Sequence, residues 1–348
     1  MLDVQHLNLR LTMKLPPGKI PIDILKEVVF KNLGATRKEV TIGPKAGVDC
    51  AVLEAGDKSI VVSMDPITGA TERVGWLAVN VNANDIATFG VEPAFLFSCL
   101  MLPEGAEKSM VETISTQMNS AALKLGMAIV GGHAESTPGL THPIVVGCAM
   151  GITPKGKFVT AAGAKAKDKI ILTKSAGIEG TAILASDRAT ELKKALPPAE
   201  LKTAQVFYRK ISVVKDALTA FKTGGVHAMH DPTEGGVAGG IHELADAAGL
   251  GVHVFQEKIR VEPETTKICS HFDLDPLQLI GSGALLIAVE PEKAEATIES
   301  PRQGQIQAAV IGEFVADKTQ RLLTQKNGAV QVLPRPVSDH LWKALSRQ

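Results

Sequence analysis

Three aspartates stand in apolar segments, where a carboxylate needs a partner. Asp49 lies in the run Gly47–Leu53, and Asp65 ends a strand-like run. Asp85 lies in the long run Val74–Gly90. A single aspartate near a strand end is most often a cap or turn residue. Several carboxylates brought together repel one another unless a proton or cation intervenes, and oxygen ligands suit Mg²⁺. Their joint placement therefore favours a magnesium site with these three aspartates as ligands.

The run that contains Asp85 also predicts how the side chains are arranged. If it forms a helix, Leu77, Val81, Asn84 and Thr88 share one stripe at the 3.6-residue period, with Asp85 beside it. An amide and a carboxylate would then lie on the face that packs inward.

A glycine-rich segment, His230–Ala245, is the second group with chemical potential. It reads as a loop followed by a helix, with Asp231 and Thr233 before the glycines Gly235 and Gly236. Free N–H groups at a helix start suit a phosphate. The segment matches neither the P-loop nor the dinucleotide glycine pattern. Glycines that only form tight turns, with Asp231 as an N-cap, are the alternative.

Two further segments contain candidate ligand-binding residues. Gly131, Gly132, His133 and Glu135 follow a predicted strand, and ligands gather at strand ends in α/β lobes. Lys45 precedes Asp49 in a flexible stretch and could reach a phosphate. A glycine turn with a solvated histidine, and a solvated lysine, are the alternatives.

Composition excludes several classes of protein. The 348 residues carry no net formal charge and are only 4% aromatic, which argues against nucleic acid as the main partner. The four cysteines show no C-x-x-C spacing, so neither a zinc ribbon nor a disulfide framework is readable. We expect a cytoplasmic protein, because the chain begins without a signal-peptide pattern and contains no apolar run long enough to cross a bilayer.

Strand and helix patterns alternate along the chain, which predicts two α+β lobes with a cleft between them. The Gly-, Ala- and Lys-rich stretch 155–169 gives the boundary, and we expect domains over 1–160 and 161–348. In the first half, strands are expected over Val48–Leu53, Ser59–Met64, Phe95–Met101, Met127–Val130 and Ile144–Ile152, and helices over Ile22–Leu33, Val74–Phe89 and Glu107–Leu125. In the second half, strands are expected over Lys169–Thr173, Gly251–Phe255 and Ala284–Val289, and helices over Thr181–Ala185, Glu200–Phe221 and Gly236–Ala248.

These segments, in this order, resemble the superfamily of aminoimidazole ribonucleotide synthetase, selenophosphate synthetase, thiamine monophosphate kinase and the hydrogenase maturation protein HypE. The resemblance runs from Ile42 to about Phe314 and is strongest to the HypE-like branch. The matching elements are Gly43-Pro44, Gly47–Val52, Ser63–Asp65, Asn84-Asp85, Gly90–Pro93, Gly131–Glu135, Asp231–Gly236, Asp275-Pro276 and Gly281–Leu286.

The resemblance implies a two-lobed α+β protein with mixed and antiparallel sheets, whose N-terminal lobe forms a dimeric barrel. It implies an enzyme that binds magnesium and ATP in a long cleft and activates an oxygen of its substrate by phosphoryl transfer. Metal and phosphates would be held by Asp49, Asp65 and Asp85, and catalysis would rest on Asp65, Asp85 and Asp231. The nucleotide would be bordered by Lys45, Asn84, Gly131, Gly132, His133, Glu135, Thr233, Gly235 and Gly236. The partners would be ATP, an acceptor, a second copy of the chain and a maturation-factor protein.

Four departures from the family pattern narrow this expectation. Val48 stands where several relatives have a second acid, and His133 replaces an acid found in many. Glu234 stands where HypE proteins usually have arginine. The final residues, Asp339–Gln348, lack the cysteine that carries the thiocarboxamide in HypE. We therefore expect a HypE-like paralogue that acts on a small molecule or a partner's carboxamide. The alternatives are a thiamine monophosphate kinase and a nucleotide-binding scaffold or sensor that has lost catalysis.

Overall fold

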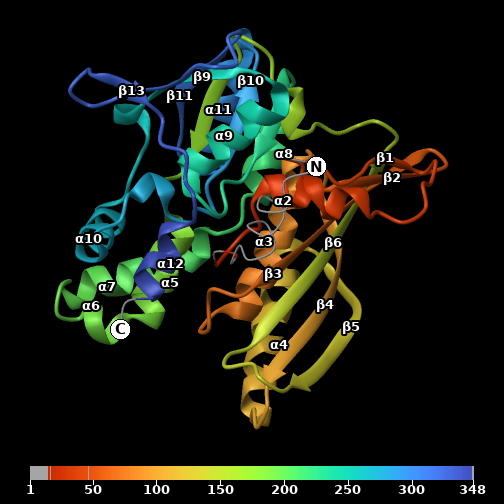
Figure 1. Cartoon of the computed structure of the whole chain (residues 1–348), viewed down its shortest axis with the longest axis vertical. Helices are drawn as coiled ribbons and strands as arrows, with labels where there is room; N and C mark the ends of the chain where they lie inside the picture. The colour runs from red at the N-terminus through yellow and green to blue at the C-terminus, as the bar shows by residue number, and fades with distance from the viewer. Residues whose placement is uncertain (1–14, 16, 46, 347–348) are drawn as a thin grey trace, which may run out of the picture.

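The structure is a computed structural model that describes residues 15, 17–45 and 47–346. It consists of two lobes that each combine a sheet with helices (Figure 1). The first contains α2 (Ile22–Glu27), η1 (Val29–Lys31), β1 (Val40–Ile42), β2 (Ala51–Ala55), β3 (Lys58–Ile67), α3 (Val74–Thr88), β4 (Pro93–Pro103), α4 (Lys108–Leu125), β5 (Ala128–Thr137) and β6 (Ile144–Pro154).

Within the described residues, the first sheet has the strand order β1-β2-β3-β6-β4-β5. Only β4 and β5 pair in parallel, and the other neighbours are antiparallel. The strand β5 lies at the edge and is exposed along nearly its whole length. It continues to Thr137, so the prediction that Gly131–Glu135 lies beyond the end of a strand is wrong. These residues pair with β4 instead, and a Cβ at Gly132 would overlap the carbonyl oxygen of Ser98.

The helix α3 is enclosed because the first sheet and α4 pack against it within the first lobe and the second lobe packs against it from the other side (Figure 1). All its residues except Trp76 are buried. The expected helix is confirmed. The predicted inward-facing stripe is not set apart from a solvated face, because nearly every residue of α3 is buried. Asn84 donates to the carbonyl oxygen of Ile211 (3.0 Å) and accepts from the backbone N–H of Val213 (2.8 Å). This amide therefore joins the two lobes.

The second lobe begins with η2 (Ala161–Gly163) and ends with α12 (His340–Leu345). Its strands are β7 (Lys169–Thr173), β8 (Val226–His230), β9 (Gly251–Phe255), β10 (Leu286–Val289), β11 (Ala308–Val315), β12 (Arg321–Thr324) and β13 (Val330–Val332). Its other helices are α5 (Ile178–Asp187), α6 (Ala189–Leu192), α7 (Pro198–Gln205), η3 (Val206–Lys210), α8 (Val214–Lys222), α9 (Gly236–Ala248), η4 (Gln256–Lys258), α10 (Pro263–Phe272), η5 (Pro276–Gln278), η6 (Pro291–Lys293) and α11 (Ala294–Gln303).

Alternation along β7 explains how the second sheet is buried on both faces. In the described part of the chain its strand order is β13-β12-β9-β11-β7-β10-β8, and β12 runs parallel to β9. Ile170 and Leu172 point into a core with α9, whereas Ile171 joins the larger core that continues into the first lobe. A strand covered on both faces is expected to be apolar throughout, as this one is.

One predicted helix, Glu200–Phe221, is wrong as a single element. The chain forms α7, then η3, and restarts as α8. The interruption lies at 211–213, where Asn84 binds the backbone of Ile211 and Val213. A tertiary contact thus overrides the helical pattern, which is otherwise confirmed for α4, with Gly126 as its left-handed C-cap, and for α9.

No helix in the described ranges is both long enough and apolar enough to span a membrane.

Candidate active site

Four aspartates converge where the lobes meet. Asp49 precedes β2, Asp65 lies in β3, Asp85 in α3, and Asp231 directly follows β8. After burial, the charges of the other three are the main causes that raise the pKa of Asp85. The predicted grouping of Asp49, Asp65 and Asp85 is therefore present, together with Asp231 from the second lobe.

A buried histidine neutralises one side of this cluster. His230, with 2% of its side chain exposed, places Nδ1 2.9 Å from Asp49 and Nε2 2.7 Å from Glu243. Burial disfavours the imidazolium, but the two carboxylates prevail and raise the pKa of His230 well above its usual value. The same contact outweighs burial and lowers the pKa of Asp49. Lys19 lies 3.8 Å from Glu243 and completes a chain of alternating charges.

At the other three aspartates, burial and like charges outweigh the nearby bases. Burial, together with Asp65 and Asp231, raises the pKa of Asp85 well above its usual range. Burial and the charge of Asp49 raise the pKa of Asp65 to about 6, although Lys19 opposes them. Burial also raises the pKa of Asp231 to about 7, against the effect of His230. The site therefore contains more buried negative charge than its own bases can balance.

Asp231 has the least satisfied carboxylate of the cluster. It is 1% exposed, and neither carboxylate oxygen has a hydrogen-bond partner among the described residues. The N-cap of α9 is Gly235, so the alternative role of Asp231 as a cap is wrong. Asp85, in contrast, accepts a 2.6 Å hydrogen bond from Ser63. Unpaired buried oxygens of this kind fit a hard cation such as Mg²⁺.

The oxygens are not arranged as a finished metal site. In the ranges that the structure covers, no three His, Cys, Asp or Glu side chains form a group that could hold a metal ion. Asp49 is engaged by His230, and Asp85 by Ser63. Binding a metal would require these carboxylates to rotate.

The remaining candidate residues divide into two groups. Thr233 lies at the cluster, where its hydroxyl oxygen accepts from Lys19 at 3.2 Å. Asn84 lies beside it, but both ends of its amide bind backbone atoms of the second lobe. Lys45 is exposed in the turn before Asp49. The group in β5, which comprises Gly131, Gly132, His133 and Glu135, is separated from β3 by two intervening strands, with His133 and Glu135 paired to each other at 3.3 Å.

The glycines at the start of α9 serve packing in this structure. The backbone N–H of Gly235 donates to Asp339 (2.7 Å), and that of Gly236 donates to Thr233 (3.0 Å). Both glycines have positive φ, and a Cβ at Gly236 would overlap the backbone at Leu279. The expectation that these N–H groups are free for a phosphate is therefore wrong here.

Sequence reasoning missed three residues of the charge chain: His230, Glu243 and Lys19. His230 appeared in the glycine-rich segment but had no visible partner. Glu243 is 13 residues further along and Lys19 is more than 200 residues away in sequence. The apolar strand that ends in a histidine was the available signal, since a buried histidine needs a hydrogen-bond partner at each ring nitrogen.

Two family models match the chain. The AIR synthase related protein N-terminal domain matches residues 47–153, and the corresponding C-terminal domain matches residues 165–324. Together these ranges cover well over half of the chain.

Curated relatives have similar lengths. The carbamoyl dehydratase HypE of Escherichia coli is 30% identical over 288 residues, which are 80% of this chain and 82% of the relative. A protein of Methanocaldococcus jannaschii named for hydrogenase expression and formation is 28% identical over 333 residues, 92% of this chain and 95% of its own.

Solved structures share the fold. A HypE–HypF complex superposes with a TM-score of 0.76 at 22% identity, covering 90% of this chain and 99% of the other. HypE in complex with ATP gives 0.69 at 21%, with 92% and 96% covered. A ThiL protein complexed with AMPPCP and TMP gives 0.71 at 20%, with 93% and 99% covered. The expected two-lobed α+β fold is confirmed, and the chain belongs to the AIR synthase related family of enzymes, among which HypE proteins are its relatives.

Proposed function

We propose that this protein is an ATP-dependent phosphotransfer enzyme of the HypE-like type. It would bind magnesium and ATP at the cluster between the lobes and activate an oxygen of a small molecule or of a partner's carboxamide. The observation that carries the proposal is the set Asp65, Asp85 and Asp231, one half-buried and two buried carboxylates whose charge the described basic residues do not balance. Folded proteins rarely keep such charge unless a ligand uses it.

The comparisons support the nucleotide and the reaction class. A HypE structure holds ATP, and a ThiL structure holds AMPPCP. The E. coli relative is named a carbamoyl dehydratase. Magnesium, when bound, would neutralise the carboxylates and phosphate oxygens. The protein's own residues would act by position: Asp231 offers two free oxygens, Ser63 orients Asp85, and Lys19 provides positive charge beside Thr233.

Replacing Asp85 with asparagine tests this proposal most directly. The amide keeps the shape and the hydrogen bond from Ser63 but removes a charge, so we expect the protein to stay folded and to lose magnesium-dependent ATP turnover. Turnover is measured as ADP formed by mass spectrometry. Asp57→Asn, at an exposed hairpin in the same lobe, is the control and should retain full turnover. Unchanged turnover in the Asp85 variant would refute the proposal.

The two alternatives are separated by products. Thiamine diphosphate formed from thiamine monophosphate would support the kinase, for which the ThiL fold is the precedent. Thermal stabilisation by ATP with neither ADP nor AMP formed would support the scaffold, because binding alone raises stability. The hydrogen bond from the backbone N–H of Gly235 to Asp339 favours the scaffold, because it leaves this N–H unavailable to a phosphate.

We also propose a homodimer formed through β5. No strand in the described part of the chain pairs with the outer side of this edge strand, and such edges are normally covered or paired. Large apolar side chains are exposed on the same sheet: Met64, Phe95, Phe97, Ile129, Val130 and Ile152. A second copy that covers them would complete the barrel and could bring its own Gly131–Glu135 segment to the cluster. The HypE–HypF complex is the precedent for a further protein partner.

A charge on β5 should break this dimer. Ile129 is 42% exposed, and Ile129→Glu would bury a carboxylate in the interface. We expect the wild-type protein to elute at twice the chain mass in size-exclusion chromatography with light scattering, and the variant at the chain mass. Val337→Glu, at a residue 95% exposed in the second lobe, should remain dimeric. A wild-type monomer, or a dimeric Ile129 variant, would rule out this interface.

A further inference from the structure

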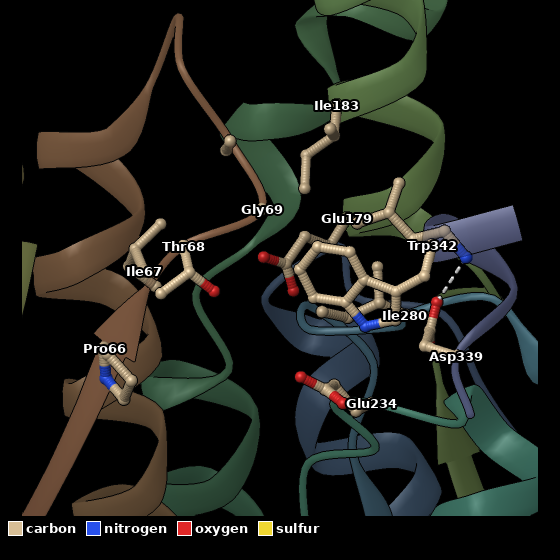
Figure 2. A pocket seen from close by; sticks show the side chains of 12 residues that line it. Pro66, Ile67, Thr68, Gly69, Glu179, Ile183, Glu234, Ile280, Asp339 and Trp342 are labelled. Atoms are coloured by element: carbon tan, nitrogen blue, oxygen red, sulfur yellow. Dashed lines mark hydrogen bonds between the residues drawn. The ribbon is translucent and has the colours of Figure 1, made fainter. Parts of the chain in front are cut away.

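A second site lies beside the aspartate cluster, in a cavity of about 60 Å³ between the lobes. The loop Pro66–Ala70 forms one wall, and Glu179, Glu234 and Asp339 come from the second lobe with Trp342 (Figure 2). We call it the acidic cavity. Its volume accommodates only a few non-hydrogen atoms, so it would hold the head of a small ligand and not a nucleotide.

Glu179 is the residue that marks this cavity as a binding site. It is 3% exposed, and its Oε2 has no hydrogen-bond partner among the described residues. Figure 2 shows its carboxylate directed away from α5 toward Thr68 and Gly69, into the cavity. Burial raises the pKa of Glu179 to about 7, although the Ser282 hydroxyl opposes this shift.

Trp342 supplies an aromatic ring to the lining of the cavity. The ring lies between Glu179 and Asp339 in Figure 2, and Gly69 packs against its edge. An aromatic ring flanked by carboxylates is a favourable environment for a cation.

The residues around the cavity favour a positively charged ligand. Its lining residues include three acids and, among the residues that the structure describes, no lysine, arginine or histidine. Asp339 accepts from the backbone N–H groups of Gly235 and Leu341, but burial outweighs these bonds and raises its pKa to about 7. The nearby Lys19 directs its side chain to Thr233 and Glu243, on the aspartate-cluster side.

We propose that the acidic cavity binds a planar cationic group, an amidinium or guanidinium, at the head of the acceptor substrate. Glu179 would pair with its N–H groups and Trp342 would stack on it, since planar cations suit both contacts. Two residues that line the cavity, Pro66 and Glu234, directly follow Asp65 and Thr233 of the aspartate cluster in sequence. A ligand in the cavity would therefore lie next to the proposed nucleotide. This inference rests on the proposed function only in calling the ligand the acceptor.

Binding of methylguanidinium, compared with its neutral isostere N-methylurea, tests the inference. Ligand-observed NMR titration of the full chain should show binding of methylguanidinium in the millimolar range and at least tenfold weaker binding of N-methylurea. Glu179→Gln keeps the shape and should weaken methylguanidinium binding at least tenfold. Trp342→Phe serves as a second variant if the first fails to fold, and it should also weaken binding. The control Glu257→Gln, on the exposed η4, should bind as the wild type does.

Three results with the two organic probes would overturn the inference. They are no binding of methylguanidinium, equal binding of both probes, or unchanged binding in the folded cavity variants. Displacement of methylguanidinium by Mg²⁺ alone, with the Glu179 variant insensitive to Mg²⁺, would show a metal site instead. Thermal stabilisation by magnesium and ATP is measured separately on the wild type. If magnesium and ATP do not stabilise the protein while methylguanidinium still binds, the proposed function is refuted. If they stabilise it and methylguanidinium does not bind, only the inference about the acidic cavity is refuted.

Discussion

Asp231→Asn is expected to make the metal-free protein more stable while it abolishes ATP turnover. The wild-type carboxylate is buried with two unpartnered oxygens, and the amide removes its charge. The gain should be a few kcal/mol at pH 8, because each unit of pKa shift is worth about 1.4 kcal/mol. Turnover should fall by roughly 100-fold or more, as is typical when a metal site loses a supporting group. Thermal unfolding in a chelator and ADP formation are the two measurements.

The stability gain has a defined pH dependence. The pKa of Asp231 is about 7 in the folded protein and near 3.8 when unfolded, so folding favours the protonated form. The wild-type penalty is absent below pH 4, develops as pH rises from 4 to 7, and is complete above 7. The difference between variant and wild type should therefore be large at pH 8 and small at pH 4.5.

A control aspartate should respond with the opposite sign. Burial opposes ionisation of Asp246, but Arg321 and Arg335 lower its pKa, so its charge contributes stability that is lost as pH falls. Asp246→Asn should destabilise slightly at pH 8, since Asp246 is about half exposed and solvent screens its ion pairs. A less stable Asp231 variant at pH 8 would show that the carboxylate is paired after all.

His230→Gln is expected to be the most destabilising single change in the site. It removes the imidazolium from between Asp49 and Glu243 and leaves two carboxylates facing each other. Breaking a buried ion pair costs about 3–5 kcal/mol. Because folding raises the pKa of His230, this stabilisation is complete below about pH 6.5 and is lost as pH rises through the folded pKa, far above that. Urea unfolding at pH 6 and at alkaline pH measures both effects.

The exposed pair of His271 and Glu191 provides the comparison. Its side chains are 29% and 37% exposed, so His271→Gln should cost less than about 1 kcal/mol. Equal losses in the two histidine variants would mean that burial does not strengthen the His230 network.

The sequence was sufficient for elements whose stabilising pattern is local. The helix α4 has an amphipathic repeat and the C-cap Gly126, and α9 and β9 also lie where their residues predict. It was insufficient where a contact with a residue distant in sequence determines the local structure. The break before α8 depends on Asn84, more than 120 residues away, and β5 extends through two glycines that normally suggest a turn.

The same distinction holds for the site. Carboxylates in apolar runs are visible as anomalies, which is why Asp49, Asp65 and Asp85 could be singled out. Their neutralising partners are not anomalous, since Glu243 lies on a helix and Lys19 precedes one. The role of Asp231 was expected, but its unpaired oxygens follow from packing that no local pattern contains.

The bond from Asn84 to the second lobe determines how a ligand can enter. Asn84 is adjacent to Asp85, so separating the lobes at this point would also displace a residue of the cluster. Entry by a hinge motion is therefore disfavoured. The short segment Gly18-Lys19 covers the cluster from outside: Lys19 bonds to Glu234 and Thr233, and Gly18 approaches Trp342 too closely for any side chain. We expect this segment, and not movement between the lobes, to control access to both sites.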